Sequence, residues 1–166
     1  MRVIAGKYKG RKLNSPENCD IRPTSDKVKE AMFSILTADV CGSRVLDLFA
    51  GTGSLGIEAL SRGADCCVFA DSSRAGLNLV KSNLQHCKVE EETKTVPGDY
   101  RKVLMNLSFR IEDGLEEKFD IVLLDPPYGK GFLTDAIEMI SDGKILREDG
   151  IIIAEHRKEE ELPDTI

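Results

Sequence analysis

The segment over residues 45–56 constrains the fold of this chain more than any other. An apolar run over residues 45–50 leads directly into Gly51-x-Gly53-x-x-Gly56 and then into a further apolar stretch. Glycines at this spacing let the backbone turn tightly and approach a ligand at the N-terminus of a helix. The pattern therefore predicts a strand, a glycine-rich loop and a helix, the first unit of a Rossmann-type nucleotide-binding fold.

Strand and helix patterns alternate along the rest of the chain. Apolar runs predict strands over residues 44–50, 66–70, 93–96, 119–124 and 150–155. Apolar side chains at helical spacing predict helices over 54–62 and 73–86, a third with Tyr100, Val103, Leu104 and Leu107 on one face, and a fourth over 132–140. This alternation implies right-handed crossovers and a mainly parallel sheet covered by helices on both faces, an α/β fold.

Composition bounds the class of protein. A chain of 166 residues with 41% apolar side chains is expected to form a single domain over residues 1–166. No apolar run approaches the ~20 residues that a membrane helix needs, so no membrane association is expected. The five cysteines are scattered and lack Cys-x-x-Cys spacing, which disfavours zinc, predicts no metal site and favours a reducing cytoplasm.

The N-terminal residues 1–24 are predicted to form a basic hairpin or arm. Short strand patterns over 3–5 and 11–13 flank a turn rich in glycine and lysine. A helix is expected to follow, capped by Thr24 or Ser25. Its predicted buried face comprises Val28, Ala31, Met32, Ile35 and Leu36.

Charge is distributed unevenly along the chain. Residues 1–30 hold eight basic and four acidic side chains, although the whole chain has a net charge of −6. A basic arm on an acidic body is expected of a protein that grips phosphates at one edge, while a solvated tail is the simpler alternative. The residues expected to contact nucleic-acid phosphates are Lys7, Lys9, Arg11, Lys12, Arg22 and Thr24. The acidic run over 90–92 is expected to be solvated surface.

The tetrapeptide Asp125-Pro126-Pro127-Tyr128 follows the expected fourth strand. Asp125 and the Pro126 carbonyl can each accept a hydrogen bond from a planar exocyclic amine. Pro127 stiffens the turn, and Tyr128 offers a flat face for stacking a base. Downstream of a nucleotide loop, this turn indicates methyl transfer from S-adenosylmethionine to a nucleobase nitrogen, with these four residues as the catalytic set.

Acidic residues also mark a cofactor site. Asp71 ends the expected second strand, where a carboxylate can bind both ribose hydroxyls. Asp47 can meet the ammonium group of the methionine moiety, and Asp99 can accept the adenine amino group or simply cap a helix. The expected cofactor-binding residues are Asp47, Phe49, Ala50, Gly51, Gly53, Asp71, Ser72, Asp99 and Tyr100. Glycines and Asp71 alone would equally suit a nicotinamide cofactor.

The motifs together resemble a known family. The Leu46-to-Gly53 block and the Asp-Pro-Pro-Tyr turn are similar to class I amino-methyltransferases. Residues 2–6, 10–13 and 22–33 resemble those of the RsmD-type methyltransferases of bacteria, which methylate guanine N2 in 16S ribosomal RNA. The likeness covers nearly the whole chain.

The resemblance implies a Rossmann-like class I methyltransferase with a seven-stranded sheet whose last strand is reversed. Only residues 156–166 follow the expected fifth strand, too few for the usual C-terminal strand hairpin. The implied partner is 16S ribosomal RNA, in the small ribosomal subunit or its assembly intermediate, with no obligate protein partner.

Two other functions stay open at this point. A DNA adenine-N6 methyltransferase can use the same Asp-Pro-Pro-Tyr turn, although nothing in the sequence suggests a separate DNA-recognition domain. A nicotinamide-dependent oxidoreductase, or an inactive nucleotide-binding module, would need only the glycine loop and Asp71.

Overall fold

The computed structural model describes residues 1–15 and 25–156 of the protein. Within them, five helices alternate with five strands after an N-terminal segment. The helices are α1 (Asp26–Ile35), α2 (Ser54–Ser61), α3 (Arg74–His86), α4 (Tyr100–Glu112) and α5 (Phe132–Asp142). The strands are β1 (Arg44–Asp47), β2 (Cys66–Asp71), β3 (Glu92–Pro97), β4 (Phe119–Leu124) and β5 (Leu146–Ala154).

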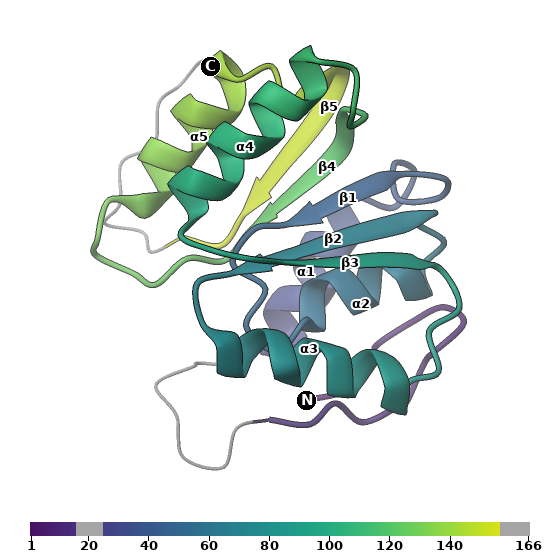
Figure 1. Ribbon diagram of the computed structural model, residues 1–166. Helices are drawn as coiled ribbons and strands as arrows, with labels where there is room; N and C mark the ends of the chain where they lie inside the picture. Colours follow the sequence, from purple (N-terminus) through teal and green to yellow (C-terminus); the bar gives the residue numbers. More distant parts are fainter. Residues whose placement is uncertain (16–24, 157–166) are drawn as a thin grey trace.

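The strands form one sheet in the order β3-β2-β1-β4-β5, and every pairing is parallel. The chain moves outward from β1 to β3, and α4 then carries it back to β4 on the other side of β1 (Figure 1). The direction of winding therefore reverses between β1 and β4. Such a reversal opens a crevice at the carboxyl ends of the strands, where open α/β sheets bind their ligands.

Helices cover both faces of the sheet, as the alternating pattern predicts. Figure 1 shows α4 and α5 on one face, and α1, α2 and α3 on the other. Two buried apolar clusters result: one includes side chains of α4 and α5, and the other includes those of α1, α2 and the N-terminal segment. The predicted α/β class and parallel sheet are confirmed. None of the described helices is both long and apolar enough to cross a membrane.

Two strand boundaries differ from those expected by more than one residue. β1 ends at Asp47, because residues 48–50 leave the strand as the glycine loop begins. The Ala50 amide still donates to the Ala70 carbonyl (2.9 Å), which ties the start of the loop to β2. β5 begins at Leu146, earlier than predicted, with a register shift against β4 between Phe119 and Ile121. Because β5 is an edge strand, the polar side chains near its start can stay exposed.

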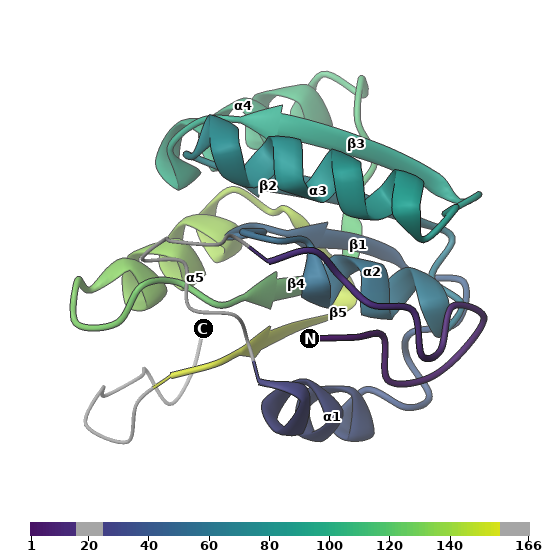
Figure 2. The same ribbon diagram turned by 90° about the horizontal axis from the view of Figure 1, so that it is seen from below.

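The N-terminal segment, residues 1–15, lies along α2 and α3 (Figure 2). The expected hairpin forms as one antiparallel bridge between Arg2 and Lys12. Backbone hydrogen bonds also join its two arms, from the Val3 amide to the Arg11 carbonyl (3.0 Å) and from the Leu13 amide to the Met1 carbonyl (3.2 Å). Three buried side chains hold the segment on the body: Val3, Tyr8 and Leu13. This segment is therefore a packed element of the domain, with hydrogen bonds from the Ile4 and Ala5 amides to the Glu58 carboxylate of α2 (2.8 and 3.0 Å).

Helix α1 buries part of the face predicted: Met32 and Leu36 are buried and Val28 is half-buried, but Ala31 and Ile35 are exposed. Ser25 caps it by accepting a hydrogen bond from the Val28 amide (3.2 Å), but Ile35 is 75% exposed. The buried positions include Lys29, which is fully enclosed and donates to the Arg2 carbonyl (2.6 Å) and the Ser54 hydroxyl (2.9 Å). The buried face is turned from the predicted one because Lys29 and Phe33 take the places expected for Ala31 and Ile35. Its ammonium lies 3.6 Å from the Glu58 carboxylate, which makes burial tolerable.

Candidate functional site

A cavity of about 450 Å³ opens at the carboxyl edge of the sheet, at the reversal between β1 and β4. It brings together the glycine loop, the ends of the strands and the Asp-Pro-Pro-Tyr turn. The predicted site residues that line it are Asp47, Phe49, Ala50, Gly51, Asp71, Ser72, Asp99, Tyr100, Asp125, Pro126, Pro127 and Tyr128. Two parts of the predicted site that are far apart in sequence therefore share one cavity.

A carboxylate stands at or just beyond the end of each strand. In the spatial order of the sheet they are Asp99, Asp71, Asp47, Asp125 and Glu155, and all five line the cavity. We call the side with Asp99, Asp71 and Asp47 the cofactor half, and the side with Asp125, Tyr128 and Glu155 the acceptor half. This row follows directly from a parallel sheet, whose carboxyl ends meet along one edge.

Asp71 fixes the shape of the glycine loop. Its two carboxylate oxygens accept hydrogen bonds from the Gly51 and Ser73 amides, both at 2.7 Å. Gly53 does not line the cavity; it precedes α2 with φ 79°, a left-handed conformation that favours glycine. A Cβ on Gly53 would approach the Val80 methyl groups at 3.2 and 3.3 Å. Gly53 thus shapes the loop from outside the cavity.

Asp47 is a buried carboxylate with an unused oxygen. One oxygen accepts the Gly56 amide at 3.0 Å, while Oδ1 has no hydrogen-bond partner among the described residues. Burial, together with the charges of Asp125 and Asp71, raises the pKa of Asp47 to about 7. A cationic group of a ligand would satisfy this oxygen and favour the ionised carboxylate. The ammonium group of S-adenosylmethionine fits that requirement.

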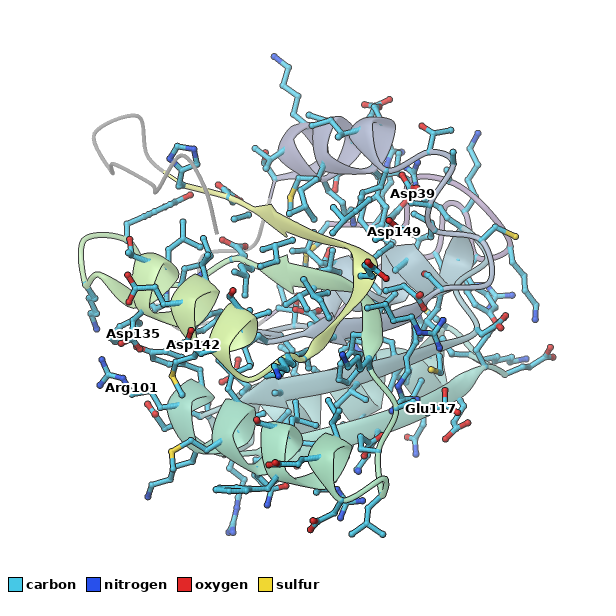
Figure 3. All side chains as sticks on the ribbon, turned by 90° about the horizontal axis from the view of Figure 1, so that it is seen from above. Asp39, Arg101, Glu117, Asp135, Asp142 and Asp149 are labelled. Carbon is cyan, nitrogen blue, oxygen red and sulfur yellow. The ribbon has the colours of Figure 1, made fainter. Side chains whose placement is uncertain are left out.

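Aromatic rings form one wall of the cavity. Phe49 and Phe132 flank Tyr100 with centroid distances of 5.3 and 5.2 Å. The Tyr100 hydroxyl donates to Asp135 (2.7 Å), and burial together with this bond raises the pKa of Tyr100 to about 12. Arg101 also binds Asp135 (2.8 Å), so α4 and α5 are joined beside the wall (Figure 3). The wall is therefore aromatic and suited to a flat heterocycle.

Asp99 caps a helix, one of its two expected roles, and also lines the cavity, where its contact with adenine stays a prediction. Its carboxylate accepts the Arg101 amide at 3.0 Å and caps α4, while the side chain remains exposed at the cavity. A carboxylate has about four lone-pair positions, so a helix cap can accept a further hydrogen bond from a ligand.

The Asp-Pro-Pro-Tyr turn follows β4 directly and enters the acceptor half. Asp125 and Tyr128 are half-buried, Pro126 is buried, and Pro127 is exposed. The Tyr128 hydroxyl donates a short hydrogen bond to Oε1 of Glu155, beyond the end of β5. The Glu155 amide in turn donates to the Leu124 carbonyl at 2.9 Å. The turn is thus held against the adjacent strand through both backbone and side chain.

The sequence missed several residues of the cavity: Leu48, Thr52, Ser54, Leu55, Ser73, Gly98, Phe132 and Glu155. Most of them neighbour a predicted residue along the chain. Glu155 is different, since it belongs to a strand that was predicted without a site residue. The signal that identified Asp47 and Asp71, an acidic residue at the end of a parallel strand, also applies to Glu155.

The basic residues of the N-terminal segment do not line the cavity. Lys7 pairs with Glu90 and Glu91 (2.8 and 3.1 Å), and the Arg11 guanidinium donates to the Cys87 carbonyl. Lys9 and Lys12 are exposed. The expectation of a fully solvated acidic run was wrong for Glu91, which accepts the Tyr8 hydroxyl at 2.5 Å and is 18% exposed. Arg22 and Thr24 lie outside the described residues.

Comparison with known proteins identifies the family. The family model described as "Conserved hypothetical protein 95" matches residues 1–166. The Bacillus subtilis protein YlbH is 42% identical, covering 100% of this chain and 88% of that protein. The "Ribosomal RNA small subunit methyltransferase D" of Haemophilus influenzae is 36% identical over 98% of this chain and 81% of its own length. The protein of the same name from Escherichia coli K12 is 35% identical over 98% of this chain and 78% of its own length.

Solved structures agree with these sequence matches. The Escherichia coli protein yhhF superimposes with a TM-score of 0.81 at 31% identity, covering 99% of this chain and 86% of that structure. The predicted family and the Rossmann-like methyltransferase fold are confirmed. S-adenosylmethionine as the predicted cofactor is consistent with both. The chain belongs to the RsmD family of methyltransferases.

Proposed function

We propose that the protein transfers a methyl group from S-adenosylmethionine to the exocyclic N2 amine of a guanine in small-subunit (16S) ribosomal RNA. One observation carries the proposal: the amine-binding turn and the strand-end carboxylates of a nucleotide site line one cavity. Relatives named as small-subunit RNA methyltransferases support ribosomal RNA as the substrate. Such a substrate implies that the protein works in the cytoplasm.

The cofactor half matches the polar groups of S-adenosylmethionine in order. From β3 to β1, Asp99 would accept the adenine amino group, Asp71 the ribose hydroxyls, and Asp47 the ammonium group. The aromatic wall beside Asp99 would pack on the adenine ring. The buried Asp47 oxygen without a partner is the strongest single fit, because a buried acceptor left unpaired is costly.

The acceptor half supplies the chemistry on the nitrogen. The cofactor, when bound, supplies an electrophilic methyl group on a sulfonium sulfur. Asp125 and the Pro126 carbonyl would accept hydrogen bonds from the guanine amine and localise its lone pair on nitrogen. Their negative charge stabilises the positive charge that develops there as the nitrogen–carbon bond forms, and the displaced proton can leave to Asp125. Tyr128 would stack on the base, worth ~1–3 kcal/mol, once the base is unpaired or flipped.

Methylation assays test the proposal directly. Purified protein with labelled S-adenosylmethionine is incubated with small-subunit RNA and with small-subunit particles, both isolated from cells that lack the enzyme. Nucleoside analysis should find N2-methylguanine, and Asp125→Ala should strongly reduce its formation. N6-methyladenine as the product, in RNA or in DNA, would overturn the guanine assignment. A thermal shift with NAD but none with S-adenosylmethionine would favour an oxidoreductase.

The N-terminal segment is proposed to hold phosphates of the RNA. Of its four predicted phosphate-binding cations, Lys7 and Arg11 are already bound to the body, whereas Lys9 and Lys12 are exposed. Replacing Lys9 and Lys12 with alanine should weaken RNA binding and reduce the log–log salt slope by about 0.7–0.9 for each phosphate that is no longer bound. Exposed Lys81 and Lys88 on the α3 side provide a matched double-alanine control. An unchanged slope would exclude this segment from RNA binding. Arg22 and Thr24 stay predicted RNA contacts.

A further inference from the structure

Glu155 is the carboxylate of the cavity that neither the cofactor nor the methyl-transfer step uses. It lies just beyond β5, the edge strand on the side of β4 away from β1. Asp125 therefore stands between Glu155 and the three carboxylates of the cofactor half. A group in this position faces the acceptor, not the cofactor.

The two oxygens of Glu155 are in different states. Oε1 accepts the Tyr128 hydroxyl, which fixes the carboxylate beside the turn that would hold the base. Oε2 is buried and has no hydrogen-bond partner among the described residues. A buried carboxylate oxygen is expected to be paired, so an unpaired one in a substrate cavity indicates that a ligand donates to it.

The chemistry of the bases identifies that donor. In guanine, the ring atom beside the N2 amine is N1, which carries a hydrogen. In adenine, the ring nitrogen beside the N6 amine is an unprotonated acceptor, and the same is true beside the N4 amine of cytosine. Guanine is therefore the base that presents two adjacent donors, the amine and a ring N–H, on its Watson–Crick edge.

We infer that Glu155 accepts a hydrogen bond from N1–H of the acceptor guanine and so selects guanine over adenine and cytosine; this inference rests on the proposed guanine-N2 function. With adenine or cytosine, the Glu155 carboxylate faces the lone pair of an unprotonated ring nitrogen. The carboxylate and the ring nitrogen are both acceptors, so each loses its hydrogen bonds to water and gains none in the cavity. Sites built to donate to or accept from one substrate group discriminate strongly against analogues that lack it.

The decisive substrate is 2-aminopurine. It keeps the amine at C2 but has an unprotonated N1, so it presents the methyl acceptor without the donor that Glu155 would bind. After the target guanine has been mapped by nucleoside analysis, RNAs carrying guanine or 2-aminopurine at that position are made by ligation of synthetic segments. Single-turnover rates on the two RNAs give a preference ratio, and calorimetry gives the affinity for S-adenosylmethionine.

Wild-type protein should prefer guanine by roughly 10- to 150-fold, the range expected when one hydrogen bond to a charged group is missing. Glu155→Gln should reduce that ratio at least tenfold, because the amide can accept the Tyr128 hydroxyl and turn a donor toward an unprotonated N1. Affinity for S-adenosylmethionine should be unchanged, since Glu155 lies beyond Asp125. Glu148→Gln, the same change at an exposed position of β5, should keep the wild-type ratio.

The outcomes separate the inference from the proposed function. If wild-type protein forms N2-methylguanine but Glu155→Gln keeps the full preference for guanine, the role of Glu155 is overturned and the function stands. Equal wild-type rates on guanine and 2-aminopurine overturn it too. If wild-type protein methylates adenine or cytosine instead, both are overturned. A loss of S-adenosylmethionine affinity in Glu155→Gln would reassign the residue to the cofactor half.

Discussion

Both halves of the cavity present carboxylates, but these carboxylates have different hydrogen-bond partners. In the cofactor half, all three carboxylates accept backbone amides: Asp47 that of Gly56, Asp71 those of Gly51 and Ser73, and Asp99 that of Arg101. In the acceptor half, Glu155 binds a side chain, the Tyr128 hydroxyl. The groups proposed to hold the cofactor thus also shape the loops, whereas in the acceptor half fold and chemistry are more separable.

The largest effect is expected at Asp125 in the acceptor half. Asp125→Ala should lower the single-turnover rate by about 10²-fold or more, the cost of removing one preorganised group from a site of developing charge. Asp125→Asn keeps one acceptor oxygen, so its single-turnover rate should lie between those of the wild type and Asp125→Ala. Affinity for S-adenosylmethionine and the melting temperature should stay near those of the wild type. A combined loss of rate, affinity and stability would show that this half is as structural as the other.

Asp71 tests whether one residue of the cofactor half serves both cofactor binding and stability. Asp71→Ala removes acceptors from two loop amides, so it should weaken S-adenosylmethionine binding by about 1.5–3 kcal/mol and lower stability as well. Asp65→Ala, at an exposed position just before the same strand, is the control. Calorimetry and thermal unfolding measure the two quantities. Weaker binding at unchanged stability would contradict the double role.

Asp47 makes cofactor binding depend on pH. Its pKa is raised from 3.8 to about 7, so part of the free protein carries a protonated Asp47 at neutral pH, while a bound ammonium group favours the ionised form. Affinity for S-adenosylmethionine should therefore fall by up to about tenfold per pH unit below 7, with proton release on binding. Calorimetry in buffers of different ionisation enthalpy measures the released proton. Asp47→Asn should abolish it, and an unaltered release in that variant would place the titrating group elsewhere.

The same pKa has a consequence for folding. Because the folded state holds this proton more tightly than the unfolded chain, the contribution of Asp47 to stability is complete below pH 3.8 and is lost as pH rises through about 7. Asp47→Asn should flatten that part of the stability profile in cofactor-free protein. Denaturant unfolding over this pH range, compared with the wild type, measures the difference.

The smallest effect is expected at the Tyr128 hydroxyl. Tyr128→Phe keeps the ring for stacking and removes the bond to Glu155, so the rate on guanine should fall by no more than about tenfold. Tyr128→Leu removes the ring as well and should cost about 1–3 kcal/mol more. Equal rates for the two variants would mean that the ring does not stack on the base.

Much of this molecule could be predicted from local patterns. The face of α4 formed by Tyr100, Val103, Leu104 and Leu107 is buried as expected, because apolar side chains at helical spacing report the face that leaves water. Strand-end acids such as Asp47 and Asp71 were found by the same local logic, since the loop that follows a parallel strand lies at the ligand edge. Their proposed ligand contacts stay predictions.

Burial of polar side chains could not be predicted in this way. Lys29 stands in the buried face of α1 because Arg2, Ser54 and Glu58 receive its ammonium group. Tyr8 is buried because Glu91, distant in sequence, accepts its hydroxyl. A polar side chain is buried only where a hydrogen-bonding or oppositely charged partner is available, and the packing of separate segments decides which partner that is.

The sequence by itself determined the alternating fold, the glycine loop, the Asp-Pro-Pro-Tyr turn and the family, because each is encoded by residues close together in the chain. Only the tertiary structure decided that Asp125 and Glu155 follow neighbouring strands, that the Tyr128 hydroxyl binds Glu155, and that Lys7 and Arg11, two of the predicted phosphate-binding cations, are held by the body. The spacing of apolar side chains shows which face of a single helix or strand is buried. Which side chains pair with one another depends on which helices and strands the order of the sheet places side by side.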